Sequence, residues 1–193
     1  MNDPSQYALL TLHNRYPGWD VRIDPTIDPA PKRIAYGGGD VGPVTDADAP
    51  DIACNRVHDP APGDIAEVRA GSEVTFHWSR WLYSHKGPIT AWMAPYDGDV
   101  ADVDVNELEF IKFAEDTVDE DGVWANVRMM DNANGTWTAK IPADIKPGNY
   151  IIRQEVRTVS SWLLTRPPWK YVLTMITSLD HSPPLRRQHH GEL

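Results

Sequence analysis

Short runs of alternating apolar and polar residues, separated by turn signals, constrain this chain more than any other feature. Val74, Phe76 and Trp78 alternate with polar residues, which places the apolar side chains on one face of a half-buried strand. Further strand candidates are residues 89–94, 109–114, 123–130, 136–141, 149–157 and 170–178. Seven such runs are typical of an antiparallel sandwich. We therefore expect an all-β fold, an immunoglobulin/fibronectin III-like antiparallel β-sandwich with long loops.

The two ends of the chain differ from this pattern. Eight prolines between residues 17 and 62 break any continuous helix in the first third. Residues 1–12 contain no Lys or Arg and lack the charged start of a secretion signal, although they could be the remnant of one. We expect residues 13–180 to form a single β-sandwich domain of catalytic type. Residues 181–193 have few apolar side chains and are expected to be a disordered tail.

Charge and composition exclude several classes of partner. The net charge is −10, so the field of the protein repels nucleic acid and anionic lipid. No stretch approaches the roughly 18 apolar residues of a membrane span. We expect neither nucleic acid nor membrane as a partner. The sequon that begins at Asn134 lies in a turn-like stretch and predicts a glycosylation site, which favours export.

One histidine stands out among the candidate functional residues. His85 precedes Gly87-Pro88 at the mouth of a predicted strand, where an imidazole can be presented at a fixed angle. The chain contains no Gly-x-Ser-x-Gly nucleophile motif and no Gly-x-x-x-x-Gly-Lys phosphate loop. It has one cysteine, so paired-cysteine zinc motifs are also absent. Most hydrolase and nucleotide-binding functions are therefore disfavoured.

Eight stretches together identify a family resemblance. They are residues 42–46, 51–55, 70–78, 84–88, 109–115, 123–125, 137–142 and 147–150. In order and content they resemble the fungal lytic polysaccharide monooxygenases of auxiliary activity family 9, formerly glycoside hydrolase family 61. The resemblance covers about residues 42 to 157. It implies a secreted β-sandwich whose flat face carries one copper ion, which activates oxygen to oxidise C1 or C4 of a β-1,4-linked glucan.

The resemblance also implies a ligand set. In the family, copper is held by the amino group and ring of an N-terminal histidine, by the ring of a second histidine and by an axial tyrosine. Nitrogen ligands of this kind hold copper in both redox states. His85 matches the second histidine and Tyr171 the axial tyrosine, while cleavage after Leu12 would place His13 at the amino terminus. We expect His85 within reach of His13 and Tyr171, with the strands of His85 and Tyr171 side by side.

The chain departs from the family pattern after Tyr150. Ser160 and Trp169 replace the outer-sphere histidine and glutamine of the family, and Gln154 replaces the histidine of its Arg-His-Glu stretch. Outer-sphere groups act on the oxygen species, so these replacements should reduce turnover more than metal binding. Thr174 stands in place of a cysteine, which leaves Cys54 unpaired and, we expect, mostly buried.

Two functions follow from the resemblance. The first is copper-dependent oxidative cleavage of cellulose or a related β-1,4-glucan by a secreted monomer, with a polysaccharide surface and an external electron donor as partners. The alternative is a degenerate, non-catalytic β-sandwich that binds glycans or the cell wall and has lost the redox centre. The N-terminus of the secreted protein discriminates between them, because only a terminal His13 completes the ligand set.

Overall fold

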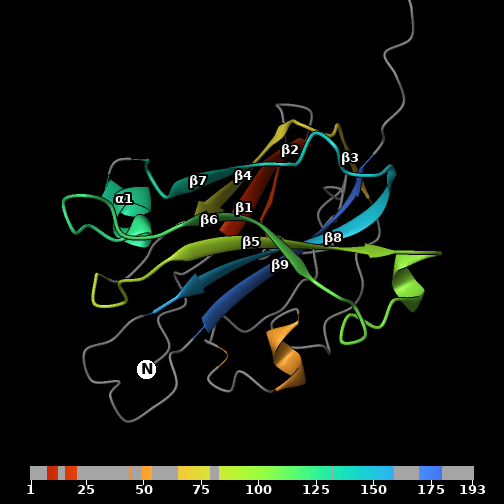
Figure 1. The fold of residues 1–193 in the computed structure, drawn as a ribbon, viewed down its shortest axis with the longest axis horizontal. Helices are drawn as coiled ribbons and strands as arrows, with labels where there is room; N and C mark the ends of the chain where they lie inside the picture. The colour runs from red at the N-terminus through yellow and green to blue at the C-terminus, as the bar shows by residue number, and fades with distance from the viewer. Residues whose placement is uncertain are drawn as a thin grey trace, which may run out of the picture.

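A computed structural model describes residues 8–12, 16–20, 44, 49–53, 65–78, 83–131, 133–158 and 170–179. Figure 1 shows two β-sheets packed face to face with one short helix at one end. The strands are β1 (Ala8–Leu12), β2 (Tyr16–Asp20), β3 (Ala66–Val68), β4 (Glu73–Trp78), β5 (Ile89–Tyr96), β6 (Ile111–Asp116), β7 (Thr136–Lys140), β8 (Gly148–Arg157) and β9 (Lys170–Leu179). The helices are α1 (Ala125–Asp131) and the 3-10 turns η1 (Pro50–Ile52) and η2 (Val100–Asp102).

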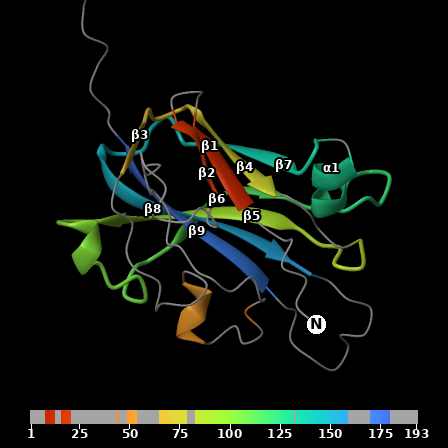
Figure 2. The ribbon, with the colours of Figure 1, turned by 180° about the vertical axis from the view of Figure 1, so that it is seen from behind.

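The first sheet has the strand order β2-β1-β4-β7 and the second has the order β3-β9-β8-β5-β6. Every described strand pair is antiparallel except β3 with β9. The predicted antiparallel β-sandwich is confirmed. Figure 2 shows the same two layers from behind, with the ends of β5, β8 and β9 stacked beside one another.

The predicted strand over residues 123–130 is wrong, because residues 125–130 of this run belong to α1. Ala125 and Met129 are buried four residues apart, which is helical spacing, and both belong to one buried apolar cluster with Trp78, Ile89 and Val156. A short apolar run fits either a strand or a helix by local pattern alone, and the two-sheet core selects the helix here. The other six predicted strands correspond to β4, β5, β6, β7, β8 and β9.

Strand β1 lies in the segment that the sequence suggested as a signal remnant. Its residues pair with β4 on one side and with β2 on the other. Residues 8–12 therefore contribute backbone hydrogen bonds to the interior of the first sheet. The division into residues 1–12, 13–180 and 181–193 otherwise stays a prediction.

The main core lies between the two sheets and is built from alternate residues of the central strands. Its buried members are Val68, Val74, Phe76, Ala91, Met93, Ala139, Ile141, Tyr150 and Ile152. The opposite face of β8 is also covered, because Ile151 packs with Ala53, Tyr96, Val100 and Val105. Strand β8 is thus buried on both faces, which explains why Tyr150 to Val156 are all buried in sequence.

A buried ion pair ties the outer face of β8 to the segment that covers it. The Arg153 guanidinium lies 2.8 Å from the Glu155 carboxylate and donates a 3.3 Å hydrogen bond to the Ile52 carbonyl. The guanidinium also lies 4.2 Å from the ring centroid of Phe110. These contacts hold η1 against the second sheet. Among the described residues, no helix is long and apolar enough to cross a membrane.

Candidate metal-binding end of the sandwich

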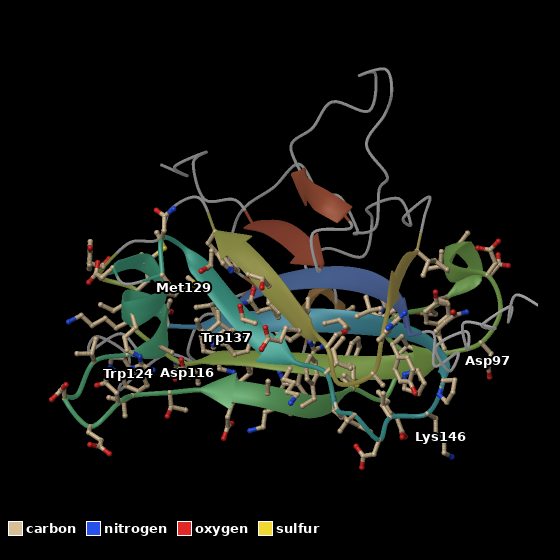
Figure 3. The ribbon with its side chains drawn as sticks, turned by 90° about the horizontal axis from the view of Figure 1, so that it is seen from above. Asp97, Asp116, Trp124, Met129, Trp137 and Lys146 are labelled. Carbon is tan, nitrogen blue, oxygen red and sulfur yellow. The ribbon has the colours of Figure 1, made fainter. Side chains whose placement is uncertain are left out.

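His85 lies at the end of the sandwich that carries α1. It belongs to the loop of residues 83–88, which enters β5 at Ile89. In Figure 3, Trp124 and Met129 mark this end of the molecule and Asp97 and Lys146 mark the opposite one. The candidate site therefore lies at one end of the sandwich, where strands β4 and β8 end and strands β5 and β9 begin.

The loop is held tightly against β8 at Gly87. A Cβ atom at this position would lie 1.8 Å from the Arg157 carbonyl oxygen, so only glycine fits. Next to it, the Arg157 amide donates a 3.1 Å hydrogen bond to the Pro88 carbonyl. The Gly-Pro pair that the sequence singled out is thus the point where the His85 loop contacts the end of β8.

The other side of the loop contacts Asn126 of α1. The Asn126 side-chain oxygen accepts a 3.0 Å hydrogen bond from the Gly87 amide, and its Nδ2 donates to the His85 carbonyl. Asn126 is completely buried. Sequence reasoning missed this residue, because the partners are separated by about 40 positions and no local pattern connects them.

The imidazole of His85 is half-buried, and this burial lowers its pKa. The ring therefore stays neutral, the form that binds metals, over more of the acidic range than an exposed histidine does. The Ser84 hydroxyl lies 3.1 Å from His85 Nδ1. A contact of this kind at one ring nitrogen orients the ring and fixes which nitrogen can serve as a ligand.

Tyr171 is the second residue of β9, and its backbone lies at the same end of the second sheet. Tyr171 pairs with Val156 of β8, which pairs in turn with Ile89 of β5. The expectation that β5 and β9 are side by side is wrong, because β8 lies between them. Two strand spacings, about 10 Å, separate the backbones of β5 and β9. The His85 loop precedes the first residue of β5. The register therefore still brings the backbones of His85 and Tyr171 to the same end of the sandwich.

The remaining predicted site residues are only partly described. Gln154 is buried between the sheets, where its side-chain oxygen accepts a 2.9 Å hydrogen bond from Trp78 Nε1. His13, Ser160, Trp169 and Cys54 lie outside the described residues. Asn134 is exposed in the turn before β7 and has a positive φ of 49°, which agrees with an accessible acceptor position.

The direction of β1 bears on His13. In the antiparallel pair of β1 with β4, Ala8 lies opposite Trp78 and Thr11 lies opposite Thr75. The chain therefore runs along β1 away from the α1 end, and His13 follows Leu12 in sequence. The pairing of His13 with His85 stays a prediction, and cleavage after Leu12 would remove β1 from the first sheet.

Tyr83 is a further exposed residue of the His85 loop. Its ring is 62% exposed, and its hydroxyl donates a hydrogen bond to Asp131 at the end of α1. This hydrogen bond and the negative charge of Asp131 raise the pKa of Tyr83. The loop is thus attached to α1 at two points, Asn126 and Asp131.

The next question is which side chains in the described part of the chain could bind copper. His85 supplies a neutral imidazole nitrogen, a good ligand for copper. No group of three or more His, Cys, Asp or Glu that could hold a metal occurs within the described ranges. His85 thus fits as one ligand, and further ligands would have to come from Tyr171 and from chain outside those ranges.

Residues 10–161 match the model of Auxiliary Activity family 9 (formerly GH61). The chain is 40% identical over 142 residues to AA9 family lytic polysaccharide monooxygenase B of Geotrichum candidum, which covers 72% of this chain and 38% of that relative. It is 39% identical over 155 residues to the monooxygenase B of Aspergillus fumigatus, covering 76% of this chain and 61% of that relative.

Solved structures give the same result. The extended catalytic domain of LPMO9A from H. jecorina superposes with a TM-score of 0.75 at 27% identity, over 93% of this chain and 74% of that one. Cel61B from Hypocrea jecorina superposes with a TM-score of 0.63 at 27% identity, over 69% and 59% of the two chains. The chain spans less than half the length of the first three curated relatives that it matches.

Proposed function

The chain belongs to auxiliary activity family 9, and on that premise we propose that it carries out copper-dependent oxidative cleavage of cellulose or a related β-1,4-linked glucan. The observation that carries this proposal is the fixed loop of His85 at the α1 end of the sandwich. This loop presents an imidazole with a lowered pKa at the same end of the second sheet as the backbone of Tyr171.

His85 is proposed as a residue that would hold copper, and Tyr171 as a second residue of the same site. The contact of Ser84 with His85 Nδ1 helps to orient the ring. When bound, copper would supply the one-electron redox chemistry that the oxidation of a sugar C–H bond requires. The residues of this chain contribute by fixing the imidazole, by lowering its pKa through burial and by holding the loop against β8.

His13 is proposed as the third ligand residue, provided that its amino group is freed by cleavage after Leu12. An amine and an imidazole from one residue form a chelate, which binds copper more tightly than separate imidazoles do. The same cleavage removes β1, which pairs with both β2 and β4. Metal affinity and fold stability of a chain that begins at His13 must therefore be measured together.

A non-catalytic glycan-binding sandwich is the second candidate. It is favoured by the replacement of two outer-sphere residues. Ser160 lacks the ring nitrogens of the family's histidine, and Trp169 lacks the side-chain amide of the family's glutamine. Gln154, the third such position, is buried and engaged with Trp78. The exposed ring of Tyr83 would remain available for contact with a sugar in either case.

The proposed setting is extracellular. The partners are a polysaccharide surface and an external electron donor, and the protein acts as a monomer. The exposure of Asn134 supports glycosylation during secretion. The family model and the fungal relatives support this setting.

Calorimetry with Cu(II) tests the ligand assignment. The full chain and a chain that begins at His13 are each compared with their His85→Ala variants. The full chain should bind copper weakly, and the chain from His13 much more tightly, with His85→Ala abolishing the gain. Variants of His189 and His190 control for adventitious metal binding by the adjacent histidines of residues 181–193, and they should not change this difference. Equal affinities throughout would reject the copper site.

Product analysis separates the two candidate functions. Cellulose is incubated with the copper-loaded protein and ascorbate, and oxidised oligosaccharides are detected by mass spectrometry. Oxidised products that disappear in His85→Ala support the monooxygenase. Binding to cellulose without any oxidised product, in a protein whose melting curve shows it to be folded, supports the glycan-binding alternative.

A further inference from the structure

Asn126 is a fully buried polar residue of α1 whose described hydrogen bonds outside the helix all go to the His85 loop. Its Oδ1 accepts from the Gly87 amide at 3.0 Å, its Nδ2 donates to the His85 carbonyl, and its backbone amide donates to the Gly87 carbonyl at 3.4 Å. A buried amide is costly unless both of its ends are paired. Asn126 satisfies this requirement with two consecutive peptide groups next to the His85 ring.

The loop is fixed from the opposite side as well. Gly87 lies against the Arg157 carbonyl so closely that no side chain fits, and the Arg157 amide donates to the Pro88 carbonyl. The backbone at His85 is therefore held between α1 and the end of β8. Because Asn126 bonds to the His85 carbonyl itself, its amide sets the position from which the imidazole projects.

We infer that Asn126 is a positioning residue for His85, which orients the imidazole toward its metal by clamping the backbone of the loop. The metal part of this inference rests on the proposed function. Asn126 acts through His85 and has no described contact of its own with the ring. A rigid ligand binds more tightly than a mobile one, because less conformational entropy is lost on binding.

The docking of α1 does not depend on this amide. Ala125 and Met129 of the same helix pack against Trp78, Ile89 and Val156 in a separate apolar cluster. Replacement of Asn126 by leucine, of similar size, should therefore leave the helix in place and release the loop. Met129→Ala is the matched control, since it weakens the docking of the helix and leaves the hydrogen bonds to the loop intact.

The experiment uses the full chain and two readouts. The first is amide hydrogen exchange at Gly87, measured by NMR without metal. The second is the affinity and EPR spectrum of Cu(II), with His85→Ala as the reference for loss of the site. Asn126→Leu should speed exchange at Gly87 at least tenfold, weaken Cu(II) binding at least tenfold and change the hyperfine splitting. Asn126→Asp keeps an acceptor for the Gly87 amide but loses the donor to the His85 carbonyl, so it should restore slow exchange only in part.

Two results would overturn the inference. One is an Asn126→Leu protein with wild-type exchange at Gly87 and a wild-type Cu(II) spectrum. The other is a Met129→Ala protein in which Gly87 exchange and Cu(II) binding change as much as in Asn126→Leu. Asn126 would then act only through the packing of α1. If the wild-type chain binds no Cu(II) through His85, the proposed function fails. Exchange at Gly87 and the NMR line widths of the His85 ring then decide whether Asn126 positions the side chain.

Discussion

Replacement of Gly87 by alanine tests the closest contact at the candidate site. The new Cβ would lie 1.8 Å from the Arg157 carbonyl oxygen, and 3.0 Å is the shortest distance that Cβ atoms adopt in practice. The loop must therefore retreat from β8 by about 1.2 Å. Arg157 of β8 is anchored by strand pairing with Lys170 of β9, so we expect the loop to move.

The energetic cost follows from the bonds that this movement breaks. The 3.1 Å bond from the Arg157 amide to the Pro88 carbonyl stretches beyond hydrogen-bond range, and the clamp of Asn126 on Gly87 is distorted. A buried hydrogen bond contributes about 1 kcal/mol and an unsatisfied buried partner costs about 1–3 kcal/mol. We expect Gly87→Ala to lower the free energy of unfolding by about 2–4 kcal/mol, and Tm by roughly 5–15 °C.

Gly98→Ala is the control for glycine replacement as such. Gly98 has a φ of +83° with nothing within 4 Å of the added Cβ, so its cost is backbone strain alone, about 1–2 kcal/mol. Urea unfolding followed by circular dichroism gives the two free energies, and thermal melts give Tm. A Gly87→Ala protein that loses no more stability than Gly98→Ala would refute the close approach of the loop to β8.

Two further predictions concern side chains at the same end of the sandwich. Trp78→Phe removes the donor to the buried side-chain oxygen of Gln154 and should cost about 1–3 kcal/mol in urea unfolding, and Gln154→Leu in the same chain should recover part of this loss. The raised pKa of Tyr83 means that its contact with Asp131 stabilises the fold below the ordinary tyrosine pKa and is lost as the pH rises through the raised value. Burial also raises the pKa of Tyr96 and Tyr150, so ultraviolet titration should show one late-ionising tyrosine fewer in Asp131→Asn than in the wild-type protein; an unchanged titration would contradict the contact.

Local sequence pattern determined the fold class and the position of most strands. Alternation in β4 placed Val74, Phe76 and Trp78 on one face, and the structure buries all three in the sandwich. This works because the two-residue period of a strand is a property of neighbouring residues. The family was recognisable for the same reason, since its motifs are short stretches that can be read one at a time. His85 was found in this way, from the Gly-Pro pair that follows it.

Only the tertiary structure decided how these elements are combined. Residues 125–130 form a helix and not the predicted strand. In this helix Ala125 and Met129 lie on one face and are buried in the apolar cluster that contains Trp78. The insertion of β8 between β5 and β9 separated two strands that had been expected to be neighbours.

The clamp of Asn126 on the His85 loop joins residues about 40 positions apart. A polar residue in an apolar run is expected to face water, unless distant backbone groups satisfy its hydrogen bonds. No pattern of neighbouring residues contains that information, because such contacts exist only after the chain has folded back on itself.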